Sequence, residues 1–88
     1  MIVKFDKRFL KDLSRIPSIH RLRIENYSFN VLHNCNSLSK PGNIKKLRGY
    51  KFYYKVRFGE YRLGIRQNNE GIVLERVLHR KNIYKVFP

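Results

Sequence analysis

The side chains best suited to chemistry lie within residues 52–67, in two runs that alternate between apolar and basic positions. The basic positions that alternation directs to one side are Lys55, Arg57, Arg62 and Arg66. If the two runs pair as an antiparallel hairpin, these cations share one surface. Lysine and arginine also occupy ordinary solvent-facing sheet surfaces. Adjacent like charges are destabilising, however, so four cations without an acid favour a surface that holds an anion.

A second group of candidates follows the last apolar run, residues 72–78. His79 and Arg80 come directly after it, and Tyr84 lies four residues beyond Arg80. The end of a strand is a rigid point from which a side chain can be directed into a concave site. Considered singly, Arg80 also suits a solvated strand end, and Tyr84 suits a core aromatic that anchors the C-terminal residues.

The other titratable residues give no support for carboxylate, thiol or metal chemistry. Asp6 fits a helix cap, and Glu60 and Glu70 fall in predicted turns. The single cysteine, Cys35, has no disulfide partner within the chain and no zinc-ligand spacing around it. No glycine-rich phosphate loop or nucleophile elbow occurs. We therefore expect no metal and no cofactor.

The composition indicates one small folded domain with an anionic partner. The chain has 88 residues, 42% of them hydrophobic, and its 20 Lys and Arg against 6 Asp and Glu give a formal net charge of +14. A single domain over residues 1–88 fits this length. The excess charge favours nucleic acid or an acidic protein as partner over a membrane, because it is spread through the chain rather than gathered in one amphipathic helix. The lone cysteine and the lack of an apolar leader or spanning segment favour the cytoplasm.

A strand followed by two helices is predicted for the first half of the chain. Residues 2–5 form the strand, and Asp6 caps a helix over residues 7–16. A proline ends that helix, and Ser18 can cap a second helix over about residues 19–33. The short turn between the helices predicts an antiparallel helical hairpin.

An antiparallel meander is predicted for the second half. Residues 34–43, rich in Asn, Ser, Pro and Gly, form a loop. Three or four strands follow, over residues 44–47, 50–58, 61–67 and 72–78. The predicted core side of the second of these strands consists of Phe52, Tyr54, Val56 and Phe58. The fold class is therefore α+β with the helices on one face of the sheet, and residues 81–88 form either a last helical turn or a loose end.

Four short motifs, in this order, resemble those of the RelE/ParE toxin superfamily. They are Lys46-Leu47-Arg48-Gly49, Tyr54-Lys55-Val56-Arg57, Gly59-Glu60-Tyr61-Arg62-Leu63, and Val77-Leu78-His79-Arg80 followed by Tyr84. The resemblance covers nearly the whole chain and is greatest to the RelE-type mRNA interferases of prokaryotic type II toxin-antitoxin systems. It implies a RelE-like fold.

The resemblance also implies an endoribonuclease that inhibits translation. RelE-type toxins cleave mRNA in the ribosomal A site, with the nucleotide's own 2′-OH as the nucleophile on the adjacent phosphate and without a metal. An acidic RelB-like antitoxin silences them. For this chain the resemblance therefore implies mRNA, the ribosome and such an antitoxin as partners. We expect the free toxin to be monomeric.

By position, the resemblance assigns site residues that coincide with the candidates above. The catalytic set is Lys55, Arg57, Arg62, Arg80 and Tyr84, with His79 as a further proton-transfer group. Flanking phosphates or ribosomal RNA are expected to contact Lys45, Lys46, Arg48, Lys51 and Arg66.

Chemical roles follow for the catalytic set. Lys55 is the candidate general base, because neighbouring cations disfavour the charged form of an amine, whereas arginine stays protonated. Arg62 and Arg80 would clamp the scissile phosphate, and Arg57 would stabilise the phosphorane or assist the leaving group. Tyr84 would stack on a base or orient the 2′-OH.

Two other functions fit the same residues. A ParE-type gyrase poison has the same fold and acts on a protein–DNA target without cleaving RNA. A non-catalytic nucleic-acid- or protein-binding module would use the basic surface only to dock. Retention of the four cations Lys55, Arg57, Arg62 and Arg80 favours the nuclease. Whether Lys55 or His79 is the general base stays open.

Overall fold

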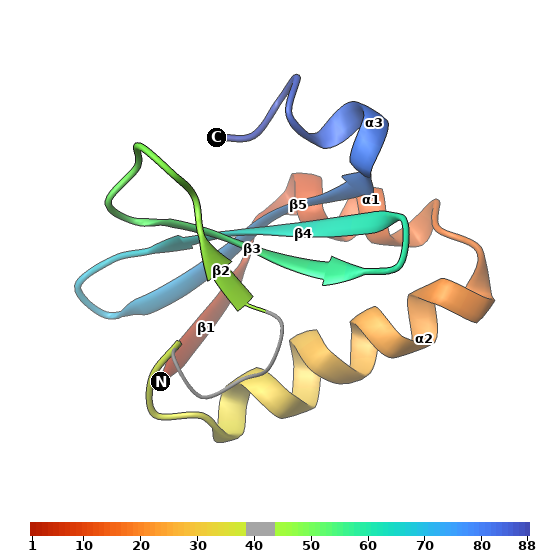
Figure 1. The fold of residues 1–88 in the computed structure, drawn as a ribbon. Helices are drawn as coiled ribbons and strands as arrows, with labels where there is room; N and C mark the ends of the chain where they lie inside the picture. Colours follow the sequence, from red (N-terminus) through yellow and green to blue (C-terminus); the bar gives the residue numbers. More distant parts are fainter. Residues whose placement is uncertain (39–43) are drawn as a thin grey trace.

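A computed structural model describes residues 1–38 and 44–88, with helices and strands in the predicted order (Figure 1). The helices are α1 Lys7–Ser14, α2 Ser18–Asn26 and α3 Arg80–Ile83, and α2 continues through a π-helical turn, Tyr27–Val31, and a 3-10 turn, Leu32–Asn34. The strands are β1 Ile2–Phe5, β2 Ile44–Lys46, β3 Tyr53–Phe58, β4 Tyr61–Gln67 and β5 Gly71–His79. Residues 39–43 of the predicted loop lie outside the described residues. No helix in the described ranges is long and apolar enough to cross a membrane.

The strands form one mixed sheet in the order β1-β5-β4-β3-β2. β2 to β5 are antiparallel neighbours, which confirms the predicted meander in its four-stranded form. β1 pairs with β5 in parallel. A parallel pair needs a long crossover connection, which the helices and the meander supply here. The predicted α+β class is confirmed.

The main core lies between the sheet and the two longer helices, on what we call the helix face. Its buried side chains are Phe9, Leu13 and Ile16 of the first helical region, Ile24, Leu32 and Leu38 further along, and Val56, Leu63, Ile65, Ile72, Leu74 and Val77 of the sheet. Tyr54 and Phe58 pack against this cluster, as their alternation with Lys55 and Arg57 predicts. Burial of these apolar side chains holds α1 and α2 on the sheet.

The C-terminal residues cover part of the opposite face, so that the sheet lies between α2 and α3 (Figure 1). Ile83 and Phe87 are 1% and 3% exposed. The ring of Phe87 packs over Gly64, where a Cβ would lie 2.8 Å from ring carbons, and it meets the ring of Tyr53 at a centroid distance of 5.6 Å. Of the two predicted alternatives for the C-terminus, the helical turn is correct.

The loop between β2 and β3 is longer than predicted. The N–H of Leu47 donates to the carbonyl of Tyr53 at 2.8 Å, and Gly49 adopts a φ of +85° that favours glycine. Residues 47–52 therefore form the loop in which the chain reverses direction, and β3 begins only at Tyr53. Phe52 precedes the strand and is 56% exposed, so its predicted core position is wrong.

The helix caps differ between the two helices. The Asp6 carboxylate accepts the N–H of Arg8 at 2.8 Å, which confirms Asp6 as the cap of α1, although this helix ends at Ser14, earlier than predicted. α2 begins at Ser18, with Pro17 as its cap residue and no side-chain cap bond. The predicted capping role of Ser18 is therefore wrong, because this serine already belongs to the first helical turn.

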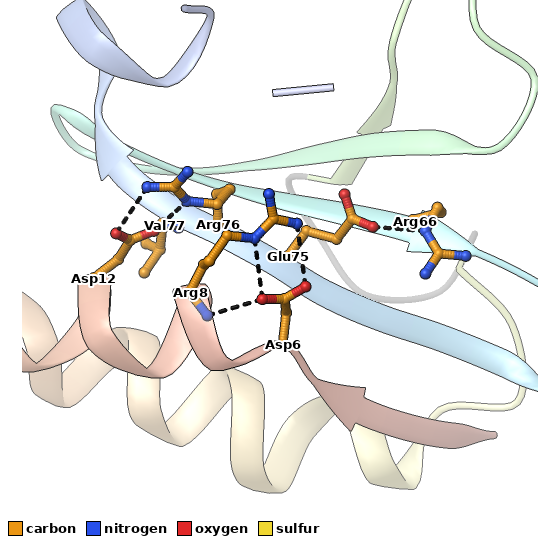
Figure 2. A network of polar contacts seen from close by, with 7 residues as sticks. All are labelled: Asp6, Arg8, Asp12, Arg66, Glu75, Arg76 and Val77. Carbon is orange, nitrogen blue, oxygen red and sulfur yellow. Dashed lines mark hydrogen bonds and ion pairs between the residues drawn. The ribbon is translucent and has the colours of Figure 1, made fainter. Parts of the chain in front are cut away.

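α1 also covers the edge of β5 beyond the end of β1 (Figure 2). β1 stops at Phe5, opposite Leu74, so the following amides of β5 lack a strand partner on that side. Asp12 of α1 accepts the N–H of Val77 at 3.2 Å and two hydrogen bonds from the Arg76 guanidinium, at 2.8 and 3.1 Å. One carboxylate, 5% exposed, thus satisfies an edge amide and binds a cation, which fixes α1 against the sheet.

Candidate active site

β2, β3 and β4 bring basic side chains together on the side of the sheet opposite α1 and α2. In the predicted hairpin, which the structure confirms, Arg57 lies opposite Arg62 and Lys55 opposite Gly64. Lys45 of β2 lies opposite Lys55. Directly opposed residues of neighbouring strands point to the same side, with Cβ atoms about 5 Å apart. We call Lys45, Lys55, Arg57 and Arg62 the basic face.

The chain reversal after α3 brings Tyr84 to the basic face. The Lys55 Nζ donates to the Tyr84 hydroxyl at 3.4 Å and lies 5.6 Å from the centre of the ring. Lys55 is partly buried, whereas Tyr84 is 50% exposed. The buried ring of Phe87 over Gly64 anchors the segment that carries Tyr84. The C-terminal anchor is therefore Phe87, and Tyr84 belongs to the accessible surface.

Two arginines gather at the turn between β3 and β4. The Arg62 Nη1 donates to the carbonyls of Gly59 and Tyr61, at 2.6 and 3.0 Å. The Arg80 N–H donates to the Glu60 carbonyl at 2.8 Å, and its Nε lies 2.7 Å from the Glu60 carboxylate. Both side chains of this ion pair are more than half exposed, so the pair contributes little stability. Arg62 and Arg80 thus adjoin the same end of the basic face.

His79 lies on the helix face instead. It is opposite Tyr61, whose ring packs against the main core, and the two ring centroids are 5.8 Å apart. His20 of α2 meets the same tyrosine at 5.1 Å. The His79 Nδ1 accepts the N–H of Lys81 and so caps α3. The His79 Nε2 lies 4.0 Å from the Glu60 carboxylate that also pairs with Arg80. The His79 ring therefore points to the helix face beside the turn between β3 and β4, whereas Lys55 points to the basic face.

All six acidic side chains form ion pairs with cations, three of which are drawn in Figure 2. The pairs, with N···O distances from 2.6 to 3.9 Å, are Asp6–Arg8, Asp12–Arg76, Glu25–Arg21, Glu60–Arg80, Glu70–Lys4 and Glu75–Arg66. Hydrogen bonds from Arg8 lower the pKa of the Asp6 carboxyl. Within residues 1–38 and 44–88, no three His, Cys, Asp or Glu side chains gather in a way that could hold a metal ion.

The cations left without an acid concentrate on β2, the loop after it, and β3 and β4. Among the residues that the structure describes, those without an ion-pair partner include Lys45, Lys46, Arg48, Lys51, Lys55, Arg57 and Arg62. Arg66, predicted to bind RNA, differs: its Nε lies 2.6 Å from the Glu75 carboxylate. Lys46 is opposite Tyr54 and so points away from the basic face. Arg48 and Lys51 lie in the loop.

Three residues that shape the site were not singled out as functional from the sequence. The sequence pattern predicts only a turn at Glu60, yet this residue forms an ion pair with Arg80. The pattern predicts a helical turn or a loose end over residues 81–88, yet Phe87 within that range is buried. Gly64 carried a usable signal, because an isolated glycine within a strand pattern often marks a close approach of another part of the chain.

The arrangement suits chemistry at a phosphodiester. Arg57 and Arg62 carry guanidinium groups whose paired N–H donors match phosphate oxygens. Lys55 and Tyr84 each have a titratable group that can take part in proton transfer. The basic face therefore combines arginines that can bind a phosphate with the Lys55 amine and the Tyr84 hydroxyl, which lie in contact.

Comparison with known proteins supports this interpretation. The family model described as "ParE toxin of type II toxin-antitoxin system, parDE" matches residues 3–84. Toxin RelE3 of Methanocaldococcus jannaschii is 46% identical over 89 residues, covering 100% of both chains.

Solved structures give the same result. A chain of the RelB-RelE antitoxin-toxin complex from Methanococcus jannaschii matches with a TM-score of 0.82 and 45% identity, over 97% of this chain and 99% of that one. A chain of the RelBE2 toxin-antitoxin complex from Mycobacterium tuberculosis matches with a TM-score of 0.67 and 28% identity, over 89% and 95%. The chain therefore belongs to the ParE toxin family of type II toxin-antitoxin systems, and within it to the toxins of the RelE type.

Proposed function

We propose that this toxin is an endoribonuclease that cleaves mRNA in the ribosomal A site and so stops translation. The observation that carries the proposal is the contact of Lys55 with Tyr84, 3.4 Å between Nζ and hydroxyl, on the basic face. Neither Arg57 nor Arg62 on that face has an ion-pair partner among the described residues. The Arg62 Nη1 donates to two backbone carbonyls, so Arg62 offers its remaining guanidinium N–H groups to a phosphate. The 46% identity with a RelE toxin supports a RelE-type activity.

Cleavage proceeds by attack of a ribose 2′-OH on the adjacent phosphate. The O2′–P bond forms as the P–O5′ bond breaks, which leaves a 2′,3′-cyclic phosphate and a free 5′-OH. Lys55 takes the proton of the 2′-OH as general base, and the Tyr84 hydroxyl orients the attacking group. The departing 5′-oxygen receives its proton from an acid, which water or a ribosomal group can supply.

The arginines stabilise the charge that develops during the reaction. Arg57 and Arg62 bind the phosphorane oxygens, and Arg57 also hydrogen-bonds the departing oxygen. Arg80 clamps the scissile phosphate by exchanging the Glu60 carboxylate for phosphate oxygens. That exchange costs little, because the ion pair is exposed to solvent.

An acidic RelB-like antitoxin is the proposed partner that silences the site. Both solved structures compared above are toxin-antitoxin complexes. A net charge of +14, with its unpaired part concentrated on β2 to β4, attracts an acidic chain and speeds its association. Because the substrate is mRNA on the ribosome, the proposed location is the cytoplasm.

The test is a translation reaction with purified ribosomes and a defined mRNA, in which primer extension detects new 5′ ends. Wild-type toxin cuts the mRNA. We expect Lys55→Ala to slow single-turnover cleavage by about 10²–10⁴-fold, as for loss of a general base. Arg80→Ala is expected to slow it by about 10²–10³-fold. Arg23→Ala, which removes an exposed cation from α2, is the charge-matched control and cuts at the wild-type rate.

Other outcomes identify the competing functions. If Lys55→Ala and Arg62→Ala both cut at the wild-type rate, the site lies elsewhere. Trapped gyrase–DNA breaks without RNA cleavage would identify a gyrase poison, and RNA binding without cleavage would identify a docking module. His79→Gln distinguishes the two candidate bases, because cleavage survives this change if Lys55 is the base.

A further inference from the structure

The loop between β2 and β3 exposes aromatic rings among unpaired cations, outside the proposed catalytic set. Tyr50 and Phe52 are 50% and 56% exposed. Tyr50 lines a surface hollow of about 490 Å³ together with Lys46, Arg48 and Lys51. Across the described part of the chain, none of these cations has an ion-pair partner. Exposed rings in such surroundings favour a ligand that offers both a flat apolar surface and negative charge.

Backbone hydrogen bonds hold this loop in one shape. The N–H of Leu47 donates to the carbonyl oxygen of Tyr53 at 2.8 Å. The N–H of Gln67 donates to the carbonyl oxygen of Phe52 at 2.7 Å. The ring of Tyr50 meets the ring of Tyr53 at a centroid distance of 5.9 Å and an interplanar angle of 82°. A ring that is already oriented loses little conformational freedom on binding, which favours affinity.

Tyr53 connects the hollow to the basic face. Its ring contacts Tyr50 and also Phe87, at centroid distances of 5.9 and 5.6 Å. Tyr53 and Lys55 point to the same side of β3 and lie about 7 Å apart, since a strand rises about 3.3 Å per residue. An RNA strand with a phosphate at Lys55 can therefore reach Tyr50 with its neighbouring nucleotides by passing beside Tyr53, whose ring packs against Phe87.

A stackable ring beside cations is the combination that binds single-stranded nucleic acid. Stacking of one base on an aromatic side chain contributes about 1–3 kcal/mol, and cations hold the adjoining phosphates. An acidic peptide would satisfy the cations but would leave the ring without a flat partner. We propose that Tyr50, with Arg48 and Lys51, forms a stacking subsite for an unpaired mRNA base that flanks the cleaved phosphate. The inference rests on the proposed function for the identity of the RNA.

Binding of an uncleavable strand tests the subsite without requiring catalysis. The probe is a short 2′-O-methyl oligoribonucleotide that carries a fluorescent base. Tyr50→Ala is expected to weaken its binding by about tenfold to a hundredfold, whereas Tyr50→Phe stays within about twofold of wild type, because the ring still stacks. Lys51→Ala lowers the slope of log affinity against log salt by about 0.7, and Tyr50→Ala leaves that slope unchanged. Leu22→Ala, at an exposed apolar residue of α2, is the control.

A second measurement uses mRNA-programmed ribosomes, in case the free strand binds below detection. There Tyr50→Ala is expected to raise the KM for cleavage by about the same tenfold to hundredfold at constant kcat, because the lost stacking stabilises the bound substrate and the transition state equally. Wild-type binding and KM in Tyr50→Ala would overturn the subsite, as would equal losses in Tyr50→Ala and Tyr50→Phe. If Tyr50→Ala weakens only antitoxin binding, the surface binds a protein instead. If it weakens only binding to ribosomes without mRNA, the surface binds ribosomal RNA instead. If the oligonucleotide effect is found but no toxin cuts RNA, the subsite stands and the proposed cleavage fails.

Discussion

Replacing Gly64 with alanine tests how the C-terminal residues hold Tyr84 against Lys55. A Cβ at position 64 would lie 2.8 Å from three carbons of the Phe87 ring. Carbon atoms in protein interiors pack about 3.5–4.0 Å apart, so the ring must move from the sheet by about 1 Å or leave its place. The ring is almost wholly buried, and its displacement exposes apolar surface to water.

The size of the effect follows from packing. Overpacking of this kind costs about 1–3 kcal/mol, and complete exposure of a phenylalanine side chain costs about 3 kcal/mol. We therefore expect Gly64→Ala to lower the free energy of unfolding by about 2 kcal/mol. Because Phe87 packs on the surface of the sheet and belongs to none of its strands, the first response is release of the segment after α3 while the sheet stays folded. Tyr84 then moves away from Lys55, and kcat for the proposed cleavage falls.

A double-mutant cycle in denaturant unfolding measures this coupling. Phe87→Ala alone should cost about 3 kcal/mol. Added to that variant, Gly64→Ala should cost less than about 0.5 kcal/mol, because the new methyl group no longer meets a ring. Hydrogen exchange of the amides of Val86 and Phe87, which donate to the Ile83 carbonyl at 3.1 and 2.9 Å, reports release of the segment. Val86→Ala, at the neighbouring exposed side chain, is the control and leaves the exchange at Phe87 unchanged.

Two results would refute this reasoning. The first is an equal cost of Gly64→Ala with and without the Phe87 ring, which would mean that the glycine is required for another reason. The second is unchanged amide exchange in Gly64→Ala despite a lower stability, which would mean that the segment does not depend on this contact.

Three further predictions concern the helices. Burial raises the pKa of Tyr27 to about 12, and its hydroxyl has no hydrogen-bond partner among the described residues. Tyr27→Phe should therefore raise the free energy of unfolding by up to about 1 kcal/mol. Because the folded pKa lies above the unfolded value of 10.0, wild type should lose stability relative to this variant as the pH rises from 10.0 to about 12, measured by urea unfolding. Asp6→Asn keeps a helix cap but loses the ion pair with Arg8. Hydrogen bonds from Arg8 lower the pKa of the Asp6 carboxyl in the folded protein. Wild type should therefore be more stable than Asp6→Asn above pH 3.8, by less than about 1 kcal/mol. In an acid titration of stability, this difference should disappear as the pH falls through the folded pKa. Asp12→Ala leaves a guanidinium and the Val77 amide unpaired and should cost about 3 kcal/mol in urea unfolding, whereas Asp12→Asn keeps one acceptor and should cost less.

Local patterning predicted the elements and the orientation of the strand cations. Alternation identified Lys55, Arg57 and Arg62 as one surface, because neighbouring positions in a strand face opposite sides whatever the strand packs against. The same rule failed at Phe52. Alternation does not show where a strand begins, and here a hydrogen bond across the loop and the positive φ of Gly49 delay that start.

Local patterning could not predict which charged side chains from different strands form ion pairs. Arg66 alternates like Arg62, yet the register of β4 against β5 shifts between Gly64 and Ile65. Glu75 is left without a Cα partner in β4, and its carboxylate lies 2.6 Å from the Arg66 Nε. Which cations stay available to a ligand therefore depends on register shifts and ion pairs between elements.

The sequence by itself determined a strand, two helices and a basic meander, because each follows from neighbours along the chain, and its net charge of +14 favoured an anionic partner. Only the tertiary structure decided that Tyr84 meets Lys55, 29 positions away, and that the His79 ring packs against Tyr61 on the helix face. The physical reason is the chain reversal after α3. It is fixed by a buried Phe87 ring on a strand position that has no Cβ, a contact that neither segment specifies alone.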